Sequence, residues 1–184
     1  IIEHDGTFVV RDDLHYGGTK ARVLAPLFAR HEEIVYATPA EGGAQTAIAA
    51  AAKRFGKQAT LFVADRKIPH PRQVMARALG ANVVTVKPGY LTVVQSRARQ
   101  YAADTGAYLL PFGANFEGAI EGIAKAAIST GFNPDEVWCA SGSGTLARGL
   151  ALAWPKAKRH VVQAGRELTP DDVCGATIHL QNLR

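Results

Sequence analysis

The sequence has few cysteines and no long apolar run, and these two shortages exclude several classes of protein. Among its 184 residues are only two cysteines, Cys139 and Cys174, which lie far apart and lack the spacing of metal ligands. We therefore expect a protein of a reducing compartment, the cytoplasm, with no disulfide framework and no metal site. No apolar run approaches the length that spans a bilayer, and the N-terminus lacks the pattern of a signal peptide, so we expect no membrane segment.

The charge of the chain is modest and positive. The formal net charge is +5, and the 47% hydrophobic and 20% charged residues are typical of an ordinary globular protein. Such a charge is compatible with an anionic partner, nucleic acid included, or with a solvated basic surface, and charge alone favours the second interpretation. The basic side chains gather in three clusters, Lys53-Arg54-Lys57, Arg66-Lys67-His70-Arg72 and Lys156-Lys158-Arg159-His160.

Short β-prone runs alternate with helical patterns along the chain, which indicates a parallel sheet because each helical crossover returns the chain in the same direction. We predict an α/β fold, an open parallel sheet with helices on both faces. It would form one compact unit over residues 1–184, and a small lobe around residues 47–110 is the alternative division. The tail, residues 165–184, shows no clear period. The expected strands are 7–10, 34–37, 59–64, 82–86, 108–111, 137–140 and 160–164, and the expected helices are 47–55, 73–79, 91–105 and 117–130, with one more that begins at Thr19.

A loop of small residues joins an apolar run to a helical pattern within residues 137–150. Its centre is Ser141-Gly142-Ser143-Gly144-Thr145. Unpaired N–H groups at a helix N-terminus attract an anion, glycines admit it closely and hydroxyls add donors, so the loop suits a phosphate group. No lysine precedes Thr145 and the glycine spacing is not G-x-G-x-x-G, so neither a Walker loop nor a dinucleotide loop is indicated. A tight turn in which the glycines serve geometry alone is the alternative.

Lys20 occupies an unusual place for a lysine. It follows the pair Gly17-Gly18 and is expected in the first turn of a helix whose N-cap is Thr19. Positive charge is unfavourable there, because the helix dipole is positive at that end. A lysine held at such a place can have a lowered pKa, which is what an amine needs to act as a Schiff-base nucleophile. An exposed lysine is the alternative, and local reasoning favours it.

Two further glycine-rich loops follow expected strands. One is Glu41-Gly42-Gly43-Ala44-Gln45-Thr46, before an alanine-rich helix, and the other is Phe112-Gly113-Ala114-Asn115. Ligands of open α/β sheets bind outside the carboxyl ends of the strands. We therefore expect all three glycine loops to converge on one crevice, with Lys20 close by.

Together these stretches resemble the pyridoxal-phosphate enzymes of the tryptophan synthase β-subunit fold (fold type II). The group they resemble most is that of 1-aminocyclopropane-1-carboxylate deaminase and D-cysteine desulfhydrase. Four motifs stand in the family's order across about residues 8–165. They are Arg11-Asp12-Asp13 with Gly17-Gly18-Thr19-Lys20-Ala21-Arg22 as the lysine segment, the loop from Glu41 as the substrate-carboxylate loop, the loop from Phe112, and Ser141 to Thr145 as the phosphate loop.

The resemblance implies pyridoxal 5'-phosphate as cofactor and a homodimer as assembly. It implies a lyase or deaminase that acts on an amino acid or an amino-acid-like substrate, with Lys20 as the catalytic residue that holds the cofactor as a Schiff base. The phosphate is assigned to Ser141, Gly142, Ser143, Gly144 and Thr145. The substrate carboxylate is assigned to Gly42, Gly43, Gln45 and Thr46.

The resemblance also suggests roles for residues near the lysine segment. Arg11, Asp12 and Asp13 are expected to brace that segment rather than to touch the substrate. Candidates for a second acid or base are His15, Tyr16 and Tyr90, and ordinary packing or surface exposure is the alternative for each.

Two features depart from the family's pattern and keep other functions open. The family carries an asparagine that bonds the cofactor's phenolic oxygen where this chain has Ala47, and no residue of the tail can be assigned to face the pyridine nitrogen. A degenerate, non-catalytic scaffold is therefore one alternative. The basic clusters suggest another, a pyridoxal-phosphate dependent lyase or decarboxylase acting on an amino acid attached to nucleic acid, in base hypermodification.

Overall fold

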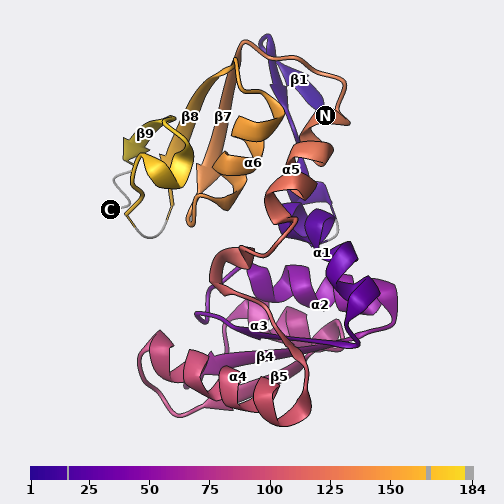
Figure 1. Ribbon diagram of the computed structural model, residues 1–184. Coiled ribbons are helices and arrows are strands. Elements are labelled where there is room, and N and C mark those ends of the chain that lie inside the picture. The colour runs from indigo at the N-terminus through magenta and orange to yellow at the C-terminus, as the bar shows by residue number, and fades with distance from the viewer. Residues whose placement is uncertain (16, 165–166, 181–184) are drawn as a thin grey trace. The chain divides into compact units, whose positions relative to one another are not determined.

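The computed structural model describes residues 1–15, 17–164 and 167–180 (Figure 1). The chain forms two compact units, residues 1–112 and residues 113–184. Each unit has its own parallel sheet and its own helices, so each is described by itself.

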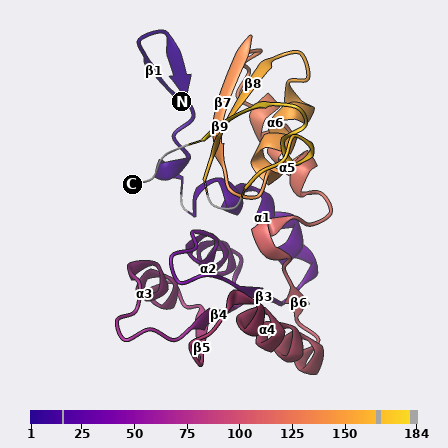
Figure 2. The same ribbon diagram turned by 90° about the vertical axis from the view of Figure 1, so that its left-hand side faces the viewer.

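A four-stranded parallel sheet in the order β5-β4-β3-β6 forms the centre of the first unit. Its middle strands, β3 and β4, are buried along most of their length, as expected of strands covered on both faces. Helices α2 and α3 lie on one face and α4 lies on the other (Figure 2). The strands are β3 (Glu33–Ala37), β4 (Gln58–Ala64), β5 (Asn82–Val86) and β6 (Tyr108–Leu109), and the helices are α1 (Gly18–Arg30), α2 (Ala44–Phe55), α3 (Pro71–Ala78) and α4 (Leu91–Thr105).

Alanine allows helix α2 to sit deep in the first unit. Six of its alanines, from Ala44 to Ala52, are buried, together with Ile48. Small side chains let a helix approach a neighbouring element closely, and alanine also has the highest helix propensity. The other side of α2 packs against α1, whose buried residues include Leu24 and Phe28. This close layering brings the N-terminal turns of the two helices together.

An antiparallel hairpin precedes the first unit's sheet. Strand β1 (Ile2–His4) pairs with β2 (Thr7–Val9), and the short 3₁₀ helix η1 (Asp12–Leu14) leads from it into α1. The sequence predicted the second strand but missed β1. All six residues of the two strands are exposed. Because no face of β1 is buried, its sequence shows no alternation of apolar and polar residues that would predict a strand.

The second unit is a three-stranded parallel sheet in the order β7-β8-β9, with α5 and α6 packed side by side on one face (Figure 2). Its core joins Val161 of the middle strand to Ala147 of α6 and to Leu168 and Val173 of the tail. The strands are β7 (Glu136–Ser141), β8 (Lys158–Gln163) and β9 (Thr177–Leu180), the helices are α5 (Ala119–Ile128) and α6 (Thr145–Ala153), and the 3₁₀ helices are η2 (Phe112–Ala114), which spans the boundary of the units, and η3 (Asp171–Val173).

The α/β prediction with parallel sheets and covering helices is confirmed, and two local predictions are wrong. Thr19 is not the N-cap of α1, because Gly17 takes that position with a φ of 87° and starts the helix earlier. Helix α2 begins at Ala44 rather than at residue 47, so two predicted substrate residues lie in its first turn. The tail, in which the sequence shows no clear period, contains η3 and β9, which are too short to produce one. None of the described helices has the length and apolarity needed to cross a membrane.

Gly149 sets the distance between α5 and α6. A Cβ at this position would lie 2.3 Å from Cγ2 of Ile123 and 3.2 Å from the carbonyl oxygen of Ile120. We expect Gly149→Ala to lower the free energy of unfolding by about 1–3 kcal/mol, since overpacking outweighs the gain in helix propensity of about 1 kcal/mol. Urea unfolding followed by circular dichroism measures this change. Gly89→Ala is the control, because its Cβ would meet nothing closer than 3.7 Å, and an equal loss in both variants would contradict the assignment.

Candidate cofactor and substrate site

Lys20 is the third residue of α1 and is only partly exposed. Its burial lowers the pKa of its amine below the usual value of 10.5. Among the described residues, the amine has no hydrogen-bond or ion-pair partner. A desolvated and unpaired amine has a larger neutral fraction than a surface lysine, and the neutral amine is the nucleophilic form.

Gly17 holds the start of α1 against α2. A Cβ at Gly17 would lie 3.2 Å from Cβ of Ala50 and 3.4 Å from Cα of Ala47, and its positive φ of 87° also favours glycine. Ala47, which stands where the resembling family has asparagine, is 2% exposed, and its atom nearest to such a Cβ is its Cα rather than its side chain. The contact of α1 with α2 at this point therefore involves the backbone at position 47.

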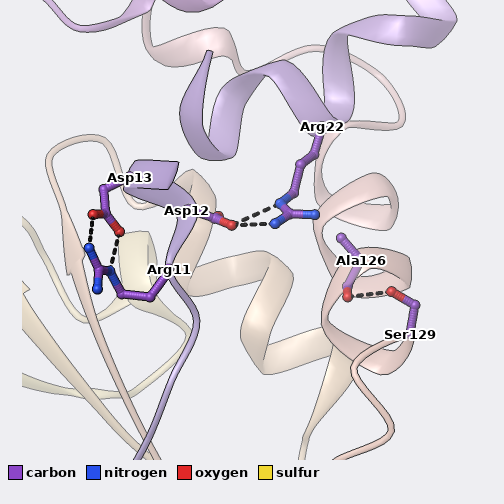
Figure 3. A network of polar contacts seen from close by, with 6 residues as sticks. All are labelled: Arg11, Asp12, Asp13, Arg22, Ala126 and Ser129. Atoms are coloured by element: carbon purple, nitrogen blue, oxygen red, sulfur yellow. Dashed lines mark hydrogen bonds and ion pairs between the residues drawn. The ribbon is translucent and has the colours of Figure 1, made fainter. Parts of the chain in front are cut away.

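Two ion pairs brace the lysine segment (Figure 3). The guanidinium of Arg22, on α1, donates to one oxygen of Asp12 at 2.9 and 2.6 Å, which ties η1 to the helix. The guanidinium of Arg11 donates to both oxygens of Asp13 at 2.7 and 2.6 Å, and this hydrogen bonding lowers the pKa of Asp13. The sequence analysis expected Arg11, Asp12 and Asp13 in this role, and it missed Arg22 as the partner.

The substrate-carboxylate loop is held together by one of its own predicted site residues. Gln45 is 0% exposed, and its amide donates to the carbonyl oxygens of Ala40 at 2.7 Å and Gly42 at 2.9 Å. Its Oε1 is buried without a partner among the described residues. The N–H of Gly42 donates to the carbonyl oxygen of Pro39 at 3.0 Å. The Gln45 side chain and the Gly42 backbone therefore shape the loop.

The same loop leaves a row of backbone donors at the N-terminus of α2. In the part of the chain that the structure describes, the N–H groups of Gly43, Ala44, Gln45 and Thr46 have no acceptor. The N-cap, Gly43, makes no side-chain cap bond, and the hydroxyl of Thr46 donates back to its carbonyl oxygen at 3.0 Å. These N–H groups, at the positive end of a twelve-residue helix, suit a carboxylate.

The glycines of the phosphate loop have a structural role in the second unit. A Cβ at Gly142 would lie 2.4 Å from the carbonyl oxygen of Ala164, and one at Gly144 would lie 2.2 Å from that of Asp172. Gly144 also has a φ of 81°. Both glycines are thus required by close backbone approach within the protein, which was the alternative that the sequence left open for them.

The loop from Ser141 to Thr145 nevertheless keeps donors that face no acceptor among the described residues. The N–H of Gly144 donates to the buried hydroxyl of Ser141 at 3.0 Å, which fixes the turn. Among the described residues, the N–H groups of Gly142, Ser143, Thr145 and Leu146 have no acceptor. The hydroxyls of Ser143 and Thr145 lie 3.1 Å apart at the first turn of α6. The donor set is that of an anion site.

The third glycine loop packs directly on the phosphate loop. A Cβ at Gly113 would lie 2.8 Å from Cβ of Ser143. Two residues later, Oδ1 of Asn115 accepts a hydrogen bond at 3.1 Å from Arg148, which lies one turn into α6. Arg148 was not predicted, because its role arises only from this contact between distant segments.

The two units each assemble part of the predicted site. The first unit joins the Lys20 segment to the carboxylate loop through the contact of Gly17 with α2, and the second joins the loops at Gly113 and Ser143. The structure gives no support to a role as acid or base for His15, Tyr16 or Tyr90. His15 is partly exposed, Tyr90 is 85% exposed, and Tyr16 lies outside the described residues.

Much of the basic charge is already engaged within the protein. Lys57 pairs with Glu32, and Lys158 lies 3.8 Å from Glu136. The guanidinium of Arg159 donates to four carbonyl oxygens, those of Trp154, Pro155, Ala157 and Cys174. Two of the three basic clusters therefore present less unpaired charge than the sequence suggests.

A family model described as pyridoxal-phosphate dependent enzyme matches residues 2–176. The chain belongs to this family. The match confirms the resemblance that the four motifs indicated, and with it the cofactor, since members of the family depend on pyridoxal phosphate. No curated protein matches the sequence.

Solved structures agree with the fold of this pyridoxal-phosphate family member. The processed form of threonine deaminase isoform 2 from Solanum lycopersicum has a TM-score of 0.71 and 21% identity, over 95% of this chain and 51% of its own. An ACC deaminase homologue has a TM-score of 0.71 and 15% identity, over 92% and 64%. The O-acetylserine dependent cystathionine beta-synthase from Helicobacter pylori has a TM-score of 0.59 and 21% identity, over 82% and 55%. The chain thus spans between half and two thirds of these structures.

The lowered pKa of Lys20 predicts its labelling behaviour in this family member without cofactor. Burial lowers the pKa of this amine, so acylation of Lys20 should reach half of its limiting rate at a lower pH in the folded protein than in the protein unfolded in urea. Competitive labelling with acetic anhydride across pH, read by mass spectrometry, gives the midpoint for Lys20 in each state. Solvent access changes the limiting rate but leaves the midpoint unchanged. A midpoint in the folded protein equal to or above that in the unfolded protein would contradict the assignment.

Proposed function

We propose that this protein is a pyridoxal-phosphate dependent lyase or deaminase that acts on an amino acid or an amino-acid-like substrate. The observation that carries the proposal is Lys20, whose amine is desolvated, unpaired among the described residues and braced at the start of α1. In the proposal this amine would hold the cofactor through the cofactor's aldehyde carbon, whose oxygen would leave as water. Family membership supplies the cofactor's identity.

The residues present fit the phosphate of that cofactor. The loop from Ser141 to Thr145 offers N–H groups without acceptors and two hydroxyls, at the N-terminus of the nine-residue helix α6. These neutral donors and the helix dipole bind a dianion without a lysine or arginine in the loop. One position does not contribute, because Ala47 has no polar group for the cofactor's phenolic oxygen.

Each remaining part of the site has a role that its own groups can perform. The N–H groups of Gly43, Gln45 and Thr46 would hold the substrate carboxylate, while Gly42 keeps the loop tightly turned. The amine of Lys20, once released to the substrate complex, would take or return the proton at the substrate's Cα. When bound, the cofactor supplies an electron sink for the bonds that break at that carbon.

The names of the similar solved structures support the class of reaction. They include a threonine deaminase, an ACC deaminase homologue and an O-acetylserine dependent cystathionine beta-synthase. A deaminase removes an amino group, so a lyase or deaminase is the class that this proposal adopts. We place it in the cytoplasm because the chain carries only two cysteines.

A substrate attached to nucleic acid ranks second. Lys53 and Arg54 are exposed at the C-terminal turn of α2, but Lys57, Lys158 and Arg159 already have partners within the protein. Affinity for nucleic acid depends chiefly on the number of phosphates neutralised by unpaired basic side chains. A free amino acid needs no such surface. The non-catalytic scaffold ranks third, because Lys20 keeps an unpaired amine.

Replacing Lys20 tests the proposal directly. Incubation with pyridoxal 5'-phosphate followed by borohydride should leave a pyridoxyl group on Lys20, located by mass spectrometry of the peptides. Lys20→Arg should abolish that adduct and the long-wavelength absorbance of the attached cofactor, because a guanidinium stays protonated and forms no such bond.

Two controls accompany this experiment. Circular dichroism should show the fold unchanged in Lys20→Arg, and Lys87→Arg should keep the adduct on Lys20. An adduct on another lysine, or none after saturating cofactor, would overturn the proposal and favour the scaffold.

We also propose a homodimer, as the family resemblance implies. Within the described residues, each parallel sheet ends in strands that pair on one side only, and burial of such exposed edges against a second copy is favourable. Light scattering of the purified protein at micromolar concentration should give about twice the 19.6 kDa mass of the chain. A monomer across that concentration range would refute this part.

A further inference from the structure

One basic cluster is left without a role by the proposed function. Arg66 and Lys67 lie in the loop after β4, His70 caps α3 by accepting a hydrogen bond from the N–H of Arg72, and Arg72 lies in the first turn of that helix. The sequence singled out these residues only for their charge. The structure relates one of them to the substrate-carboxylate loop.

Arg72 contacts the substrate-carboxylate loop directly. Its Nη1 donates a hydrogen bond to the carbonyl oxygen of Glu41. A Cβ at Gly43 would lie 3.7 Å from Nη1 and 3.9 Å from Cζ of the same guanidinium. The positive charge of Arg72 therefore lies against the residue that begins the row of unpaired N–H groups.

The charge of this guanidinium is unpaired. No acid forms an ion pair with Arg66, Lys67 or Arg72 in the described part of the chain, although Glu41 and Asp65 belong to the same segments. An arginine has five N–H donors, and the contact with Glu41 uses one of them. Arg72 is also exposed, so its remaining donors are open to a ligand. An arginine that served only to brace the loop would not need this unpaired charge.

We infer that Arg72 is a specificity residue that selects a substrate with a second anionic group besides its α-carboxylate. The inference rests on the proposed function, in which the N–H groups from Gly43 to Thr46 hold the α-carboxylate. The planar guanidinium beside them matches a side-chain carboxylate or a phosphate ester, each of which accepts paired hydrogen bonds. Arg66 and Lys67 add long-range attraction for the same group.

Matched pairs of ligands test the inference on the cofactor-loaded protein. The pairs are aspartate with asparagine and O-phosphoserine with serine, which differ in the second negative charge, and they distinguish a carboxylate from a phosphate ester. Binding is measured by isothermal titration calorimetry and by the change in cofactor absorbance, so no turnover is needed. The wild-type protein should bind the anionic member of at least one pair about 10- to 100-fold more tightly, as expected for charged hydrogen bonds.

Variants of helix α3 assign that preference to Arg72. Arg72→Gln should remove the preference and leave the neutral ligand's affinity within about twofold, and Arg72→Lys should keep part of it, because it keeps the charge but loses the planar fork. Arg77→Gln is the matched control, since Arg77 is exposed in the last turn of the same helix. If Arg72→Gln unfolds, the double variant Arg66→Gln, Lys67→Gln should still lower the preference for the anionic ligand. This reduction should become larger as the salt concentration falls, because salt screens long-range attraction.

Three results would overturn the inference. The first is equal affinity of the wild type for both members of both pairs. The second is an equal loss of affinity for both members of a pair in Arg72→Gln, which is expected if Arg72 only braces the loop. The third is a loss of preference in Arg77→Gln as large as that in Arg72→Gln. The outcome is separable from failure of the proposed function, in which the wild type forms no adduct at Lys20 at all. Normal adduct formation without anionic preference refutes the specificity role alone.

Discussion

The close packing around Gly17 is the constraint on which the lysine segment of the first unit depends. A Cβ at Gly17 would lie 2.7 Å from Cβ of Ala21 in α1, 3.2 Å from Cβ of Ala50 and 3.4 Å from Cα of Ala47 in α2, so a larger residue there would displace a neighbour. This packing fixes the start of α1, and with it the position of Lys20 and the desolvation that lowers its pKa.

The two loops that are proposed to bind anions are built in a similar way. In each loop, one polar side chain stabilises the turn by hydrogen bonds to the loop's own backbone. This side chain is Gln45 in the first unit and Ser141 in the second. In the second loop, Gly142 and Gly144 allow a backbone approach that a Cβ would block, and in the first a Cβ at Gly42 would meet the hydroxyl of Thr38. In both loops the N–H groups of the next helical turn have no acceptor among the described residues. The groups proposed to bind anions are therefore backbone donors held by side chains. Substitution of those side chains would act through loop geometry rather than through a lost contact with the ligand.

The sequence predicted most elements of this protein because their patterns are local. Helix α4 and strand β5 were predicted with the observed bounds, and the parallel α/β class followed from their alternation. Short or exposed elements were missed, since β1 and β9 bury too little to leave a period. Residue types at the loops were also sufficient to indicate the family.

Sequence alone determined the fold class, the family and the identity of Lys20 as the candidate nucleophile, because these depend on residue type and order. The tertiary structure decided what each loop residue does. It assigned Gln45 to the inside of its loop, Gly142 and Gly144 to close backbone contacts, and Arg72 to the side of Gly43. The roles of Gly142, Gly144 and Arg72 depend on which distant segments touch, and no periodicity or spacing encodes a contact between segments far apart in the chain.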